Sequence, residues 1–291
     1  MTWQTIESDP GVFTQLISDL GAKDIQVEEL YAIDKDLISQ YDPIYGVIFL
    51  FKWGKEHGEQ SAQGGTLDEN ASTSLWFAHQ TIQNACGTQA ILSILLNNPG
   101  IELGEKLDGF KDFTREFPPE IRGDALTNSE VFARVHNSFA RVEPWEEEER
   151  KPKEGEEGEA PYHFIAYVPV DGTLFELDGL KPAPVNHGPV AGSSSAEFAD
   201  ALIPVLERRI STFASTSIEF SLLALTKDLR LSPFATEETR MEEEEKRKRW
   251  AREQELRQHS FLPLVMGLVK EVVKRRVAEG KSFVQEDVME Q

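Results

Sequence analysis

One cysteine in the chain is placed where a thiol can become a nucleophile. Cys86 is the only cysteine among 291 residues. It stands just before the nearly continuous apolar run Ala90–Leu96, which is typical of a helix buried on most of its sides. Asn84 is a suitable N-cap residue, and Asn97-Asn98-Pro99-Gly100 is a stop signal. Cys86 is therefore expected in the first helical turn, where unpaired backbone N–H groups and the helix dipole favour a thiolate.

Turn chemistry brings a histidine and a carboxylate together further along the chain. Two strand-like runs, His163–Val170 and Thr173–Asp178, are joined by Asp171-Gly172, which is a strong signal for a two-residue β-hairpin turn. Pairing across this turn makes Asp178 the diagonal neighbour of His163 on the same face of the hairpin, with Cα atoms about 7–8 Å apart. Their side chains are then able to meet.

These residue types are the ones that thiol hydrolysis requires. The reaction needs a thiolate, a histidine that holds and later delivers a proton, a group that orients the histidine, and donors for an oxyanion. Cys86, His163 and Asp178 can supply the first three. Gln80, shortly before the cysteine, can supply an oxyanion donor.

Each of these residues also has an ordinary structural interpretation. A lone cysteine is by default a small buried hydrophobe. Gln80 can be a surface amide, Asp178 can be a turn residue, and His79 is a rival base because it is close to the cysteine in sequence. No metal or cofactor is expected, because one cysteine and scattered histidines show no ligand spacing.

The elements that must position these residues indicate a mixed α/β domain. The run Tyr45–Trp53 is almost continuously apolar and of strand length, so it is expected to be a central strand buried on both faces. Ser194-Ser-Ala-Glu197 is a capping-box pattern that opens a helix. Further elements are expected as a helix over 10–20, strands over 25–33 and 218–227, a helical turn over 34–40, weaker helices over 103–113 and 128–139, and connections over 55–70 and 179–192.

Composition favours an intracellular protein that binds neither nucleic acid nor membrane. The formal charge is −21, from 51 acidic and 30 basic residues, which argues against polyanionic partners and for a partner with a basic face. A single cysteine suits a reducing compartment, here the cytosol or the nucleus. No secretory signal is recognised at the N-terminus, and the apolar run 261–269 is too short to cross a bilayer.

Two charged stretches stand apart from the globular pattern. The segment Glu143–Glu159 is rich in Glu and almost free of apolar residues, so it is expected to form a mobile loop. After a boundary near Ser232-Pro233, four Glu residues at 242–245 stand four positions before four basic residues at 246–249, which predicts a solvated helix with ion pairs. An apolar stripe from Leu264 to Val273 follows and should dock on the main domain, on a second copy or on a partner.

Four separated motifs resemble the ubiquitin carboxyl-terminal hydrolase family of cysteine proteases. They are the segment Gln80–Ala90 around the cysteine, the histidine segment from His163, the aspartate segment Gly172–Gly179, and the N-terminal Trp3 with Glu7–Thr14. The resemblance implies a papain-like α/β domain, with a central, mostly antiparallel sheet flanked by helices. It implies a catalytic domain over 1–231 that contains an active-site crossover loop at 141–161.

The same resemblance implies roles for the four residues and a substrate. Cys86 would be the nucleophile, His163 the general base and acid, Asp178 its orienter, and Gln80 an oxyanion donor. The bond cleaved would be the one after the C-terminal glycine of ubiquitin. A non-catalytic ubiquitin-binding adaptor is the alternative from another functional class.

The C-terminal part, 232–291, resembles the helical tail domain of the proteasome-associated member of that family. The similarity is carried by Arg257–Pro263 and the helix that follows. It implies that these helices bind a ubiquitin-receptor subunit of the proteasome. A chromatin-associated member with the same tail is a weaker alternative, because the two parts are closely spaced here.

Overall fold

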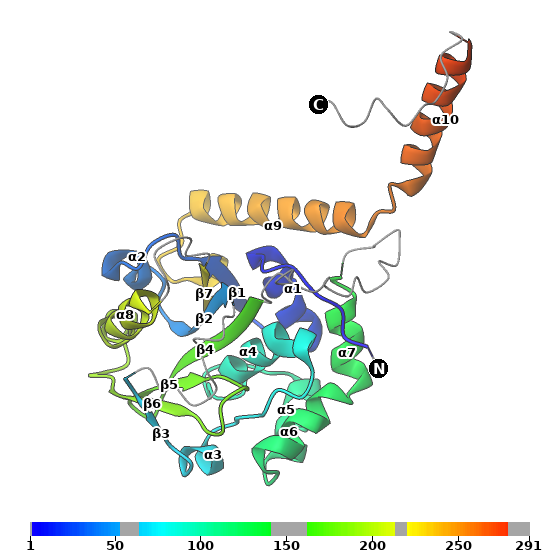
Figure 1. Cartoon of the computed structure of the whole chain (residues 1–291). Coiled ribbons are helices and arrows are strands. Elements are labelled where there is room, and N and C mark those ends of the chain that lie inside the picture. Colours follow the sequence, from blue (N-terminus) through cyan, green and yellow to red (C-terminus); the bar gives the residue numbers. More distant parts are fainter. Residues whose placement is uncertain (1, 53–63, 141–161, 213–219, 279–291) are drawn as a thin grey trace.

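A seven-stranded sheet forms the centre of the molecule (Figure 1). The computed structural model of the chain describes residues 2–52, 64–140, 162–212 and 220–278. The strands lie in the order β1–β7–β2–β4–β5–β6–β3, and each neighbouring pair is antiparallel. Their bounds are β1 Ile25–Glu29, β2 Ile44–Lys52, β3 Thr66–Leu67, β4 Tyr162–Val170, β5 Thr173–Leu177, β6 Val185–Pro189 and β7 Phe220–Lys227.

Helices cover both faces of this sheet (Figure 1). One face carries α2 (Lys35–Ser39) and α8 (Ser195–Ser211). The other carries α1 (Pro10–Leu20), α4 (Cys86–Leu95), α5 (Glu105–Thr114), α6 (Pro119–Thr127) and α7 (Glu130–Asn137). Each layer has its own buried core, one including Phe13, Ile48 and Ile91 and the other Phe49, Tyr167 and Phe198. The expected antiparallel sheet flanked by helices is confirmed.

Strand β2 is central and buried on both faces, as its sequence predicts. It lies between β7 and β4. Successive side chains of a strand point to opposite faces, and accordingly Ile48 belongs to the α4-side core while Val47 and Phe49 belong to the α8-side core. Both faces of β2 therefore need apolar side chains, which explains the continuous run.

Two elements in the connections differ from the sequence-based expectation. The connection 179–192 contains strand β6, and helix α6, which is not among the expected elements, begins at Pro119 after the N-cap residue Pro118. The two-residue strand β3 lies within the expected loop 55–70, and the short helix α3 (Ala71–Ser74) follows that loop directly. The segment Glu143–Glu159, and with it the expected crossover loop, lies outside the described residues.

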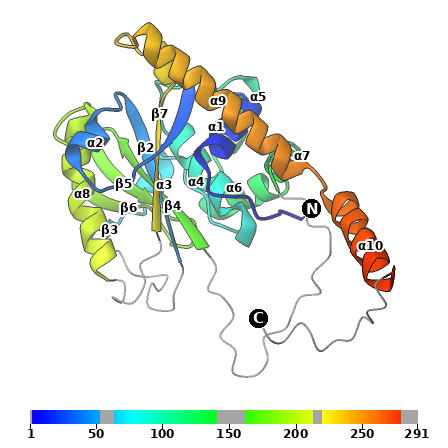
Figure 2. The same cartoon turned by 90° about the horizontal axis from the view of Figure 1, so that it is seen from above.

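The C-terminal part forms two long helices. Helix α9 (Glu237–Gln258) lies across the body formed by the sheet and its helices, and α10 (Leu262–Ala278) extends away from that body in both views (Figures 1 and 2). Lys246 pairs with Glu243 and Lys248 with Glu245, so these pairs are three residues apart rather than the expected four. No described residue of α10 is buried, so its apolar stripe does not dock on the main domain. Among the described residues, no helix combines the length and the apolar character that a membrane span needs.

Candidate active site

The single cysteine lies at the start of the buried helix. Cys86 is the first residue of α4, every residue of that helix is buried, and a short 3₁₀ turn, η2 (Gln83–Ala85), leads into it. The prediction that Asn84 caps the helix is wrong: the cap position falls on Ala85, and the Asn84 side chain donates to the Trp3 carbonyl instead (3.0 Å). The amides of the first turn therefore have no side-chain cap, and they stay close to the thiol at the positive end of the helix dipole.

The β4–β5 hairpin brings His163 and Asp178 into direct contact. The turn residues Asp171 and Gly172 adopt left-handed φ values of 48° and 73°, which a two-residue turn of this kind requires. Val170 pairs with Thr173 across the turn, as the sequence predicts. His163 Nε2 lies 2.7 Å from Asp178 Oδ1, and both side chains are almost fully buried.

Asp178 is held in place from a second direction. The backbone N–H of Leu180 donates to the same carboxylate oxygen at 3.0 Å. Because Asp178 engages Nε2 of the imidazole, the other ring nitrogen, Nδ1, is the one left to serve the thiol. Such an arrangement fixes both the orientation and the tautomer of the histidine.

The surroundings of His163 favour its protonated form. Burial by itself would lower the pKa, but the charge and hydrogen bond of Asp178, together with a hydrogen bond and charge interaction with Cys86, raise the pKa of His163 to about 9. A thiol and an imidazole that interact in this way can share one proton as a thiolate–imidazolium pair. The Phe51 ring meets the imidazole edge-on, with centroids 5.8 Å apart.

The backbone of Gln80 is hydrogen-bonded to the loop that follows Asp178. Its backbone N–H donates to the Gly179 carbonyl at 2.8 Å, and Gly179 comes directly after Asp178. This bond joins the segment before the cysteine to the loop that follows β5. The rival base His79 lies next to Gln80, and its ring contacts the Pro182 carbonyl (3.1 Å) and the Glu120 carboxylate (3.4 Å).

Sequence reasoning missed a buried ionic cluster beside this site. Glu176, two residues before Asp178, is fully buried and accepts from Lys181 and Arg209, both at 2.6 Å, and contacts His187 at 3.0 Å. Arg209 also lies over the Phe51 ring, 5.7 Å from its centroid. The available signal was the spacing of Glu176 on β5 and Asp178 just past the end of that strand, because extended backbone places residues two apart on the same side.

The arrangement is suited to acyl transfer through a thiol. It has a thiol at a helix N-terminus, a histidine that interacts with the thiol, and a buried carboxylate in contact with the histidine. These are the groups that such a reaction uses.

Two family models match the chain. One is described as ubiquitin carboxyl-terminal hydrolase, family 1, and covers residues 3–211; the other, described as ubiquitin carboxyl-terminal hydrolases, covers residues 235–277. Ubiquitin carboxyl-terminal hydrolase 2 of Schizosaccharomyces pombe is 44% identical over 286 residues, which are 95% of this chain and 93% of the relative. The isozyme L5 of Dictyostelium discoideum is 44% identical over 229 residues, which are 78% of this chain and 62% of the relative.

Solved structures show the same architecture. UCH37 of Trichinella spiralis, bound to ubiquitin vinyl methyl ester, is 34% identical with a TM-score of 0.63, over 94% of this chain and 98% of that one. Its catalytic domain, bound to the same compound, is 37% identical with a TM-score of 0.65, over 78% of this chain and 97% of that one.

Proposed function

This chain belongs to family 1 of the ubiquitin carboxyl-terminal hydrolases and is a cysteine-protease deubiquitinase, and we propose on that premise that Cys86 is its nucleophile. The observation that carries the proposal is the buried His163–Asp178 contact of 2.7 Å, because it prepares an imidazole that interacts with Cys86. Ubiquitin and its conjugates are the substrates of this family.

The proposed reaction proceeds in two acyl-transfer steps. The Cys86 thiolate attacks the carbonyl carbon of ubiquitin's last glycine, and a C–S bond forms while the negative charge moves to the carbonyl oxygen. The His163 imidazolium then gives its proton to the leaving amine as the C–N bond breaks. In the second step His163 takes a proton from water as the water oxygen attacks the thioester carbon. The C–S bond then breaks, ubiquitin leaves with a free carboxylate after losing a proton to solvent, and the Cys86 thiolate and His163 imidazolium are restored.

Two kinds of donor would stabilise the oxyanion in both steps. We propose that the Gln80 side-chain amide is one and that a backbone N–H at the start of α4 is the other. Asp178 does not exchange protons with substrate in this scheme. It keeps the imidazole in the required orientation and stabilises its charge.

A Cys86→Ala variant tests the nucleophile. Hydrolysis of a fluorogenic ubiquitin C-terminal amide should fall to background, and ubiquitin vinyl methyl ester should no longer form a covalent adduct. Binding of unmodified ubiquitin serves as the control and should persist. Activity that survives the substitution would refute the assignment, while a wild-type chain that binds ubiquitin but never forms the adduct would favour the non-catalytic adaptor.

We further propose that the C-terminal helices bind a ubiquitin-receptor subunit of the proteasome. Support comes from the match of the tail to the second family model and from the exposed apolar side chains of α10, including Leu264, Leu268 and Val272. Isolated apolar stripes of this kind are typical of helices that enter a partner's groove. A cytosolic and nuclear location, which a single cysteine suits, is proposed with it.

A charge placed in the stripe tests this partner. Leu268→Asp should abolish binding of the purified receptor subunit in a pull-down, because a carboxylate would have to be buried in an apolar interface. Hydrolysis of the small fluorogenic amide should be unchanged. Lys270→Ala, on the same helix, is the matched control, and equal binding by wild type and Leu268→Asp would contradict the proposal.

A further inference from the structure

A segment of irregular backbone, residues 75–80, carries Gln80 alongside the helix that carries Cys86. The segment has no regular secondary structure, and Leu75, Trp76, Phe77 and Ala78 are all buried. Its place must therefore be fixed by hydrogen bonds to neighbouring elements rather than by a helix or a strand ladder.

Those bonds come from two opposite sides. On one side the buried Arg122 guanidinium donates to the carbonyls of Leu75 (2.9 Å) and Phe77 (3.3 Å). On the other side, two side-chain amides, one on α4 and one just past its end, form hydrogen bonds with the residues in between, Trp76 and Ala78. Asn97, just past the helix end, exchanges two hydrogen bonds of 2.8 Å with the backbone of Trp76, and Gln89 donates from Nε2 to the carbonyl of Ala78 at 2.6 Å.

Gln89 is the contact nearest to the reacting groups. It follows Cys86 by three positions on α4, so the two residues share one face of the helix. Its bond to Ala78 lies two residues before Gln80, and the Gln80 backbone N–H in turn donates to Gly179, next to Asp178. Gln89 therefore links the helix of the nucleophile to the segment of the oxyanion donor.

The Gln89 side-chain amide is buried with one of its polar atoms unpaired. The side chain is only 5% exposed, and among the described residues its Oε1 has no hydrogen-bond partner. An unpaired buried acceptor is destabilising, because it has lost its hydrogen bond to water. Gly179 also packs directly against this amide, since a Cβ on Gly179 would come within 2.2 Å of Gln89 Nε2 and 3.0 Å of the Gln80 backbone nitrogen. The close approach depends on glycine.

We propose that Gln89 is a positioning residue that sets the place of the Gln80 amide relative to Cys86. The inference rests on the proposed oxyanion role of Gln80. Gln89 touches no substrate in this scheme. It acts through Ala78, and a shift of about 1 Å in a catalytic group is enough to lower turnover by up to 10²-fold.

A double-mutant cycle tests this proposal. Gln89→Met keeps the volume but removes the N–H donor, and it should lower kcat for the fluorogenic ubiquitin amide about tenfold while KM stays within about twofold. Gln80→Ala alone should lower kcat by about 10²–10³. If Gln89 acts through Gln80, Gln89→Met should have no further effect on kcat in the Gln80→Ala background.

Two measurements separate positioning from general damage. Alkylation of Cys86 by iodoacetamide needs the thiolate but forms no oxyanion, so its rate should be the same in Gln89→Met and wild type. Gly179→Ala, which pushes on the same amide from the other side, should reproduce the loss in kcat. Asn98→Ala is the matched control: it removes a helix-end amide that donates to Tyr45 and Ile94 and does not contact the segment, so its kcat should stay within about twofold.

The outcomes distinguish the positioning role of Gln89 from the oxyanion role of Gln80, on which it rests. Equal losses from Gln89→Met in both backgrounds, or a slower alkylation of Cys86, would overturn the positioning role and leave the oxyanion role of Gln80 intact. If Gln80→Ala leaves kcat unchanged, the oxyanion assignment fails and the positioning role fails with it.

Discussion

His163 is buried, yet its surroundings stabilise the charged imidazolium. Desolvation opposes the charge, and the contact with Asp178 more than offsets it, with Cys86 adding to the effect. The raised pKa keeps a proton available on the histidine through neutral pH. In a thiol hydrolase this proton is needed by the leaving amine, so on the alkaline side activity should decline where the imidazolium is lost.

Asp178→Asn should therefore move the alkaline side of the pH–activity profile. The folded-state pKa of His163 is raised from 6.5 to about 9, and removing the Asp178 charge should return it toward its ordinary value. The decline of kcat/KM at high pH should then begin about two pH units lower, on top of a general loss of activity. The measurement is kcat/KM for the fluorogenic amide between pH 5 and 10.

Glu120→Gln provides the control for that shift. Glu120 is the carboxylate beside a different histidine, His79, at 3.4 Å. Its neutralisation should leave the alkaline side of the profile where it is in wild type. An Asp178→Asn profile that keeps the wild-type alkaline limb would show that this carboxylate does not set the protonation of His163.

At the residue scale, sequence reasoning succeeded where local rules apply. The His163–Asp178 contact follows from a two-residue turn, because that turn fixes the register of the strands on both sides of it. The cap was misplaced because the Asn84 side chain is used in a contact with Trp3, far away in sequence. The role of Gln89 depends on a loop packed beside α4, and no spacing rule contains that information.

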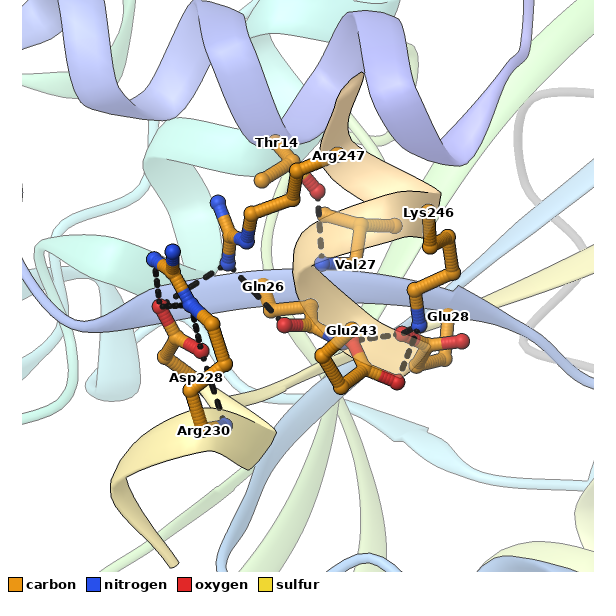
Figure 3. A network of polar contacts seen from close by, with 9 residues as sticks. All are labelled: Thr14, Gln26, Val27, Glu28, Asp228, Arg230, Glu243, Lys246 and Arg247. Carbon is orange, nitrogen blue, oxygen red and sulfur yellow. Dashed lines mark hydrogen bonds and ion pairs between the residues drawn. The ribbon is translucent and has the colours of Figure 1, made fainter. Parts of the chain in front are cut away.

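At the scale of elements, a network of polar contacts joins helix α9 to the catalytic domain (Figure 3). Arg247 donates to Asp228 (2.9 Å) and to Gln26 on β1 (3.0 Å), and Lys246 donates to Glu28 on β1 (2.6 Å). Near the other end of the helix, Arg257 contacts Glu7 and Asp9 at 2.9 and 3.0 Å. One face of the highly charged helix α9 therefore forms hydrogen bonds and ion pairs with the edge strand β1.

Lys246→Ala should loosen this helix. The side chains of Glu28 and Glu243, both mostly buried, would lose their shared cation, and unpaired carboxylates in partly buried places are destabilising. Backbone hydrogen exchange over 237–258 should become faster, on the order of tenfold, which corresponds to about 1.4 kcal/mol. Exchange followed by mass spectrometry measures this directly.

Lys248→Ala is the matched control on the same helix. Lys248 pairs with Glu245, and the two side chains are 68% and 72% exposed. Exposed pairs contribute little to stability, so exchange should match wild type. Equal acceleration by both substitutions would mean that helix propensity, rather than docking, controls the exchange of α9.

Elements with a single dominant signal were predicted, and elements that depend on their neighbours were not. The apolar run of β2 and the capping box of α8 carry their own evidence, and both elements are found. Strand β6 has polar residues and glycine in its middle, so its own sequence gives no strand signal, and it is a strand through its pairing with β5 and β3. The ion pairs of α9 follow the fold rather than the four-residue spacing, since Lys246 turns toward β1.

At the scale of the whole molecule, the Glu176 cluster joins the sheet to helix α8 behind the site. Its carboxylate is fully buried between the Lys181 ammonium and the Arg209 guanidinium. Burial alone would raise the pKa of Glu176, but Arg209, His187 and Lys181 together lower it well below the ordinary range. A buried group of this kind gives little net stability while intact, and it costs much more when one partner is removed.

Glu176→Gln should lower the free energy of unfolding by about 3–5 kcal/mol, because it leaves two buried cations without their shared anion. It should also change how stability depends on acid. The folded-state pKa of Glu176 is depressed, so the wild-type contribution is present above the unfolded pKa, 4.5, and is lost as pH falls below it. Urea unfolding at pH 7 and at pH 4 should show a smaller acid-induced loss of stability in the variant than in wild type.

The matched control is Glu102→Gln, which removes an exposed partner of Lys23. It should leave the free energy of unfolding at both pH values within about 0.5 kcal/mol of wild type. An equal acid-induced loss in wild type and Glu176→Gln would contradict the idea that this carboxylate is charged in the folded protein.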